Sequence, residues 1–274
     1  MNNNLIIHIG HHKTGTTFLQ NFIFPCYKEL SVVRAWYSHR KITEMPLKKN
    51  ILITDEGISG NPFRGNYFDE FEKNIVNIKK LYGDVKILVG FREHSSMILS
   101  LYKQHLHEKG YLTLEEFFNK QNTGLIRQEE LKFLIRVEIL KKHFTHIFVY
   151  LQEDLKSNID LFITKLSHFI GVDLNKEEFE FFKDKAANVG IRTEKQVRLL
   201  RTMNILNSKK YCPNLYGTKL TRYKLTPRDI CQNRMKDSGD IFKMNSNLKT
   251  FITNLYNEDW QGIKLLSSIS VNEK

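Results

Sequence analysis

A chain of 274 residues, 41% of them hydrophobic and 12% aromatic, can bury a substantial core, which argues against a disordered protein. Its formal charge is +12, and the stretch from Lys195 to Lys243 supplies nine of those charges. This concentration favours either an anionic partner (nucleic acid, membrane, acidic glycan or charged cofactor) or a solubilising surface. The three cysteines form no C-x-x-C pair, so neither a zinc site nor a disulfide framework is supported.

The N-terminus has neither the basic region nor the apolar core of a signal peptide. Its apolar run, Leu5–Ile9, is far too short to cross a bilayer. With cysteines that suit a reducing compartment, these features predict a cytoplasmic protein without a transmembrane segment.

Short apolar segments alternate with segments of helical period along the first 170 residues. The predicted buried strands are Leu5–Ile9, Ile51–Thr54, Val85–Phe91 and Ile147–Leu151. The predicted helices are Thr17–Phe24, Phe68–Leu81, Ser95–His107, Leu131–His143 and Asn158–Ile170. This alternation predicts an α/β fold with a doubly wound, mostly parallel sheet flanked by helices.

The strand signal fades after about residue 190, and 191–274 has the pattern of helices and loops. We see no internal repeat and no low-complexity tract. The sequence therefore predicts one domain, 1–274, with an α/β core at 1–190 and a basic helical subregion at 191–274.

Three segments fall just past predicted strand ends: 10–17, 55–56 and 92–100. In a doubly wound sheet, ligands bind beyond the carboxyl ends of the strands. We therefore expect these segments to converge in space.

The first segment reads GHHKTGTT. Glycines let the backbone turn tightly, and free amides at the start of the following helix can bind an anion. The ordinary nucleotide-binding loop has its lysine after the second glycine, whereas Lys13 precedes Gly15 by two residues. The pattern thus suits a phosphate group without matching the usual ATP loop.

The order K-T-G-T-T after a first strand resembles the 5′-phosphosulfate loop of sulfotransferases that use 3′-phosphoadenosine 5′-phosphosulfate (PAPS). A second signature of that family, an arginine at a strand end and a serine eight residues later, resembles Arg92 and Ser100. The resemblance implies the P-loop-like sulfotransferase fold, with PAPS as co-substrate and Lys13 stabilising the transferring group. The donor-binding residues that it implies are Gly10, His12, Lys13, Thr14, Gly15, Thr16, Thr17, Arg92, Ser100 and Arg192.

The chain departs from this family at two places. The family often has proline two residues after its arginine, where this chain has His94. The glycine-rich C-terminal segment that grips the 3′-phosphate in cytosolic sulfotransferases has no obvious counterpart. Arg192, in the segment 188–192, is its candidate substitute.

Sulfuryl transfer also needs a base for the proton of the acceptor. The resemblance favours Glu56, at the end of an apolar strand, with Asp55 as its competitor. Histidines remain alternatives, because cytosolic sulfotransferases use one. The chain has ten, among them His8, His11, His12, His94 and His105. Of these, His11 and His12 are expected instead to line the phosphate site.

The sequence thus predicts an enzyme that transfers a sulfuryl group from PAPS to a hydroxyl or amine of an acceptor, with a glycan as one acceptor class. No metal is implied. Two alternatives remain: a P-loop kinase, against which the position of Lys13 argues, and a nucleic-acid-binding protein. The second explains the charge but gives Lys13, Arg92 and Ser100 no purpose.

Overall fold

The computed structural model describes residues 4–34, 49–183, 185, 190–211, 227–231 and 239–267. The chain forms two compact units. The first contains 1–94, 128–187 and 255–274, and the second contains 95–127 and 188–254. The expected single domain with a subregion from residue 191 stays a prediction.

The first unit is built on a five-stranded sheet in the order β2-β3-β1-β4-β5, with every pair parallel. The strands are β1 (Asn4–Gly10), β2 (Leu30–Arg34), β3 (Asn50–Asp55), β4 (Lys86–Phe91) and β5 (Ile147–Leu151). The four predicted strands are all present, and the α/β fold with a parallel sheet is confirmed.

Strand β2 was not predicted. It lies at the edge of the sheet, and only its first and fourth residues, Leu30 and Val33, are buried. A strand of five residues with this pattern lacks the continuous apolar run that marks strands covered on both faces.

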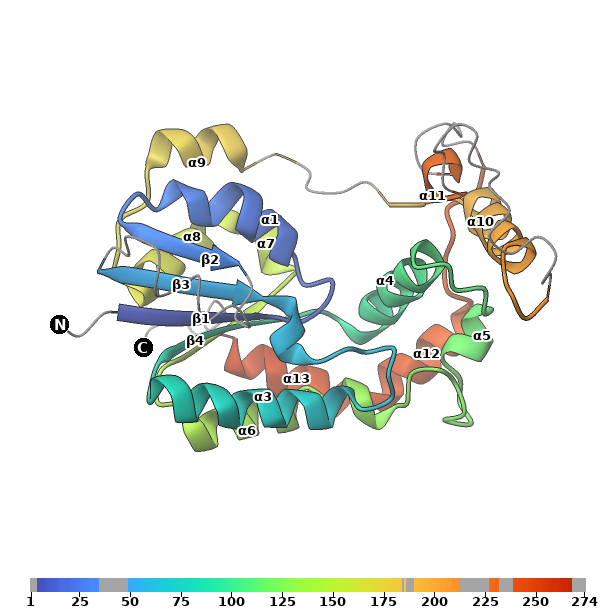
Figure 1. Cartoon of the computed structure of the whole chain (residues 1–274), viewed down its shortest axis with the longest axis horizontal. Helices are drawn as coiled ribbons and strands as arrows, with labels where there is room; N and C mark the ends of the chain where they lie inside the picture. The colour runs from blue at the N-terminus through green and yellow to red at the C-terminus, as the bar shows by residue number, and fades with distance from the viewer. Residues whose placement is uncertain are drawn as a thin grey trace. The chain divides into compact units, whose positions relative to one another are not determined.

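Helices cover both faces of the sheet, α3, α6 and α13 on one and α1, α7, α8 and α9 on the other (Figure 1). Their bounds are α1 (Thr16–Phe18), α3 (Tyr67–Tyr82), α6 (Leu134–His143), α7 (Asp154–Ser157), α8 (Ile159–Ile170), α9 (Lys176–Phe182) and α13 (Asn257–Leu266). Since both faces are buried, the strands carry apolar side chains on both sides.

The helix predicted at Thr17–Phe24 is irregular. Only Thr16–Phe18 is α-helical; a π-helical turn follows at Leu19–Ile23 and a 3₁₀ turn at Phe24–Cys26. Pro25 lies within the 3₁₀ turn and has no backbone N–H to continue a regular ladder.

Helix α6 begins three residues later than predicted, and the reason is a residue far away in sequence. The carboxylate of Asp259 accepts hydrogen bonds from the amides of Phe133 and Leu134, at 3.0–3.1 Å. His94 is buried beside it, with Nε2 3.2 Å from Asp259 Oδ2 and its ring stacked on Tyr256. His94, which stands where the sulfotransferases that the sequence resembles often have proline, therefore connects the end of β4 to α13.

The second unit is helical, with α4 (His94–His107, its first residue in the first unit), α5 (Leu114–Phe117), α10 (Glu194–Leu206), α11 (Pro227–Asp229) and α12 (Ser246–Leu255, its last residue in the first unit). Buried Asn204 joins α10 to the end of α4 by donating to the carbonyls of Leu106 and Gly110, at 2.8 and 2.7 Å. Across the described ranges, no helix is both long and apolar enough to cross a membrane.

Candidate active site

The carboxyl ends of β1, β3 and β4 meet at one edge of the sheet. Ile9 of β1 lies opposite Asp55 of β3, and Gly10 lies opposite Gly90 of β4. Arg92, just past β4, donates from Nη1 to the carbonyl oxygen of Lys13 at 3.2 Å. Of the expected convergence of 10–17, 55–56 and 92–100, the part that involves 10–17, 55–56 and Arg92 is therefore confirmed within the first unit.

The loop after β1 depends on backbone conformations that few residues adopt. Lys13 has φ 68° and Gly15 has φ 90°, both in the left-handed region. A Cβ atom on Gly10 would lie 2.2 Å from Thr16 Oγ1, so the strand can approach the helix start this closely only with glycine there. This turn holds Lys13 at the sheet edge beside the first turn of α1.

A series of buried polar side chains supports the loop. Thr14 Oγ1 donates to the carbonyl oxygen of His11 at 2.7 Å and is also in contact with the hydroxyl of Tyr150. That hydroxyl lies 3.0 Å from His8 Nε2, and His8 Nδ1 lies 2.8 Å from Thr54 Oγ1. Thr14 therefore serves the geometry of the loop from a fully buried position.

Among the buried polar atoms at this edge that have no hydrogen-bond partner are two donors, Thr16 Oγ1 and Arg92 Nε. A buried donor without a partner costs about 1–3 kcal/mol. Both lie beside a loop whose helix start leaves amides without intrahelical acceptors. The loop amides and Thr16 Oγ1 therefore fit an oxyanion such as a phosphate, and Arg92 Nε can donate to a further anionic group of the same ligand.

Arg92 is mostly buried. Burial lowers the pKa of its guanidinium, while the carboxylates of Glu153 and Glu93 act in the opposite direction. Glu153 Oε1 in turn accepts from the backbone amide of Glu93 at 3.1 Å, which links the segment after β5 to the segment after β4. Arginine remains cationic despite such a shift, so Arg92 keeps its charge.

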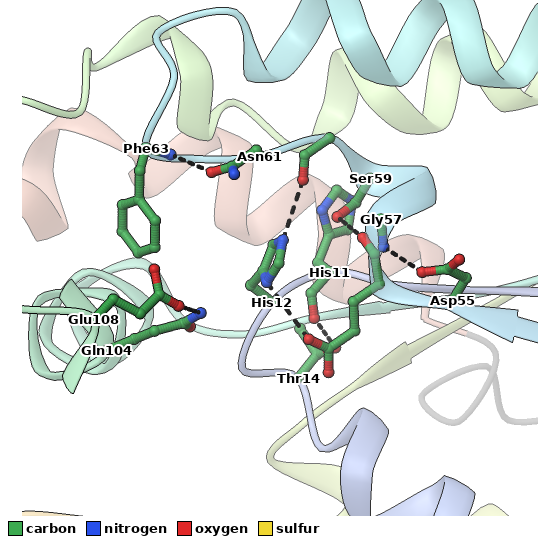
Figure 2. A network of polar contacts seen from close by, with 12 residues as sticks. His11, His12, Thr14, Asp55, Gly57, Ser59, Asn61, Phe63, Gln104 and Glu108 are labelled. Atoms are coloured by element: carbon green, nitrogen blue, oxygen red, sulfur yellow. Dashed lines mark hydrogen bonds and ion pairs between the residues drawn. The ribbon is translucent and has the colours of Figure 1, made fainter. Parts of the chain in front are cut away.

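The two carboxylates after β3 have different surroundings. Asp55 caps the 3₁₀ turn Glu56–Ser59, because its Oδ1 accepts from the amide of Gly57 at 2.7 Å (Figure 2). Glu56 is the first residue of that turn, its side chain is 36% exposed, and its Oε2 lies 3.5 Å from His12 Nδ1. A solvated carboxylate at the sheet edge is the better placed of the two to meet an acceptor.

The turn that carries Glu56 rests on a buried cation that the sequence did not single out. Arg136 is fully buried, with its guanidinium 4.1 Å from the ring centroid of Tyr67. Its Nη1 donates to the carbonyl of Ser59 and its Nη2 to that of Glu130, at 3.4 and 3.1 Å. Nothing local in the sequence around 136 separates this arginine from a surface residue.

The candidate histidines lie in different places. His8 is buried in β1, and this burial lowers its pKa to about 3, so it is neutral. His11 is buried among aromatic rings, with Nδ1 2.8 Å from the hydroxyl of Tyr67, and burial lowers its pKa well below the usual value. His11 thus lies in the aromatic core. His12 is half-buried beside Glu56, and His94 is in the contact with Asp259.

Ser100 and Arg192 belong to the second unit. Ser100 lies within α4 and is half-buried, while Arg192 is exposed just before α10. His105 lies near the end of α4 in the same unit. Of the basic stretch Lys195–Lys243, residues 212–226 and 232–238 lie outside the described residues.

A family model described as "Sulfotransferase domain" matches residues 4–189. The chain belongs to this family. The match covers the strands, the loop after β1 and the Arg92–Ser100 segment. This protein is therefore an enzyme of sulfuryl transfer, and the resemblance drawn from KTGTT, Arg92 and Ser100 is confirmed at the level of the family.

Solved sulfotransferases share the fold of this enzyme. One, from Alicyclobacillus acidocaldarius, is 12% identical with a TM-score of 0.50. The match covers 77% of this chain and 95% of the chain of that protein. Another, a mouse sulfotransferase complexed with PAP, is 13% identical with a TM-score of 0.52. The match covers 97% of this chain and 90% of the chain of that protein. A comparison with curated protein sequences gave no match.

Within the described ranges, no three His, Cys, Asp or Glu side chains gather as a metal site would require.

Proposed function

We propose that this sulfotransferase takes its sulfuryl group from PAPS and transfers it to a hydroxyl or amine of an acceptor. The observation that carries the donor assignment is the loop at 10–17, where Thr16 Oγ1 and Arg92 Nε are buried donors without partners beside Lys13. The fold shared with a PAP-complexed sulfotransferase adds support.

In this proposal PAPS supplies the sulfuryl group, and 3′-phosphoadenosine 5′-phosphate (PAP) is the product. The amides of Gly15, Thr16 and Thr17 bind the 5′-phosphate, and Gly10 gives that loop its close turn. Lys13 neutralises charge as it develops on the bridging oxygen, which is where a cation lowers the barrier most.

Arg92 is the proposed ligand of the 3′-phosphate within the first unit. Ser100 and Arg192, in the second unit, are carried over from the family signature and from the sequence alone, Arg192 as the substitute for the missing glycine-rich segment. An arginine fork suits a phosphate because it can donate two parallel hydrogen bonds. His12 is the remaining donor-site candidate from the sequence. Both of its contacts, with Gly60 and with Glu56, lie at the turn after β3.

Glu56 is the proposed general base. The proton of the acceptor hydroxyl moves to the Glu56 carboxylate as the acceptor oxygen bonds to sulfur. The bond between sulfur and the bridging oxygen breaks, its electron pair stays with the phosphate, and Glu56 later loses the proton to solvent. Asp55 is the lesser candidate, because one of its oxygens already accepts from the Gly57 amide.

For the acceptor we propose a glycan with acidic groups. Lys195 and Arg198 are exposed on α10, at the start of the basic stretch, and would attract such a chain. A cytoplasmic location is also part of the proposal; the described cysteines, Cys26 and Cys231, are free thiols, as a reducing compartment would keep them.

A transfer screen tests the proposed reaction. Purified enzyme is incubated with ³⁵S-labelled PAPS and separate panels of acidic glycans, neutral glycans, phenols, lipids and amines. We expect label to move to an acidic glycan without added metal. Labelled product only from phenols or lipids would contradict the glycan assignment, and no labelled product from any panel would contradict PAPS as donor.

A further inference from the structure

His12 lies between two acceptors of hydrogen bonds. Its Nε2 is 3.1 Å from the carbonyl oxygen of Gly60, and its Nδ1 is 3.5 Å from Glu56 Oε2 (Figure 2). Nδ1 is buried and makes no hydrogen bond, so its 3.5 Å approach to Glu56 Oε2 is an ion-pair contact. Both ring nitrogens thus face the turn after β3.

The first contact fixes the tautomer of the ring. A carbonyl oxygen can only accept a hydrogen bond, so Nε2 must carry the hydrogen in the contact with Gly60. In a neutral imidazole the other nitrogen, Nδ1, then carries only a lone pair.

The second contact is favourable only with a further proton. A bare Nδ1 beside an ionised Glu56 carboxylate would set two lone pairs against each other. A proton held between Nδ1 and Oε2 turns that repulsion into a charge-assisted hydrogen bond. Such bonds are often long in the absence of substrate and tighten when it binds.

We propose that His12 is a positioning residue for Glu56: it shares one proton with Oε2 and so orients the carboxylate, leaving the other oxygen, Oε1, to take the acceptor proton. This inference rests on the proposed role of Glu56 as base. It replaces the expectation that His12 binds the donor phosphate.

The surroundings of His12 are rigid enough for this task. The amide of Gly60 donates to the carbonyl of Gly57 at 3.1 Å, which closes the turn whose carbonyl His12 contacts. Gly60 has φ 87°, and Arg136 holds the neighbouring carbonyl of Ser59. The His12 side chain is only 16% exposed, so its ring has little freedom to leave Glu56.

The proton balance of the transfer is unchanged by this role. The acceptor proton goes to Oε1 as the bond between acceptor oxygen and sulfur forms and PAP leaves. The proton between Oε2 and Nδ1 stays in place, and Glu56 releases the transferred proton to solvent. His12 therefore affects the rate of proton transfer and leaves the binding of PAP unchanged.

Two substitutions separate the contact of His12 with Glu56 from its contact with Gly60. In His12→Asn the side-chain amide replaces the ring near Nδ1 and can still donate to Glu56; in His12→Gln the amide reaches the position of Nε2 and donates to Gly60. We expect His12→Gln to lower kcat about 10–100-fold, as loss of an orienting partner does, and His12→Asn to lower it less. Titration calorimetry should give both variants a Kd for PAP within about threefold of wild type. His168→Gln, on the exposed face of α8, is the matched control.

A double-mutant cycle tests whether the effect passes through Glu56. In the Glu56→Gln background, His12→Gln should cause no further loss of kcat, because the group that it orients is already disabled. A loss of equal size in both backgrounds would overturn the proposal. So would a Kd for PAP raised tenfold or more with kcat unchanged, which would return His12 to the donor site.

A spectroscopic measurement needs no acceptor and no variant of His12. In ¹⁵N-histidine-labelled wild-type protein, NMR should show a hydrogen on Nε2 of His12 and a Nδ1 signal that shifts towards the unprotonated value in Glu56→Gln. A His12 protonated on Nδ1 alone, or a Nδ1 signal indifferent to Glu56→Gln, would contradict the proposal. Failure of the transfer screen would instead contradict the proposed function and leave this test of the contact standing.

Discussion

Lys13→Ala is expected to lower kcat about 10³-fold, one of the two largest losses that a single substitution in this chain should cause. Removing one group that stabilises charge in the transition state costs about 10²–10³ in kcat, and a full cation should lie at the upper end of that range. The substitution is clean in the backbone, because lysine and alanine both carry a Cβ and pay the same penalty at φ 68°.

The measurement is steady-state transfer from PAPS to the acceptor found by the screen, with calorimetric titration of PAP alongside. The Kd for PAP should rise about 10-fold, less than kcat falls, because the new charge on the bridging oxygen exists only during transfer. Lys142→Ala, on the exposed end of α6, removes the same charge and should leave both values unchanged. A loss of kcat below tenfold in Lys13→Ala would remove Lys13 from the reaction.

Glu56→Gln is expected to lower kcat about 10²–10⁴-fold while the Kd for PAP stays unchanged. Glutamine keeps the shape of the side chain but cannot accept the acceptor proton, and general bases contribute rate factors of this size. The unchanged Kd follows because Glu56 lies on the turn after β3 and contacts His12 rather than the loop amides.

Asp55→Asn is the matched control for this substitution. Asparagine keeps an oxygen that can accept from the Gly57 amide, so the cap of the turn survives and turnover should stay within a few-fold of wild type. Near-wild-type turnover in Glu56→Gln together with a large loss in Asp55→Asn would assign the base to Asp55.

Much of the first unit could be predicted from local pattern. Continuous apolar runs such as Ile147–Leu151 marked the strands because both faces of the sheet are covered. The KTGTT order and the eight-residue spacing from Arg92 to Ser100 marked the family, since both reflect the needs of one ligand. Edge strand β2 escaped prediction because partial burial removes that continuity.

What the sequence could not provide are contacts between residues far apart along the chain. The start of α6 depends on Asp259, which lies 125 residues after Leu134. The support under the Glu56 turn comes from Arg136, and the contact of His12 with Glu56 joins two loops. Each depends on tertiary packing, so no local pattern around those residues could reveal it.

Titration calorimetry of the wild-type enzyme with PAP and, separately, with ATP and magnesium tests the central claim most directly. A site for a nucleotide phosphorylated at both ends should bind PAP at least about tenfold more tightly than ATP–magnesium, since the 3′-phosphate adds charge-assisted hydrogen bonds. Arg92→Ala should remove most of that preference. Tighter binding of ATP–magnesium than of PAP would contradict the assignment of this loop to a sulfate donor.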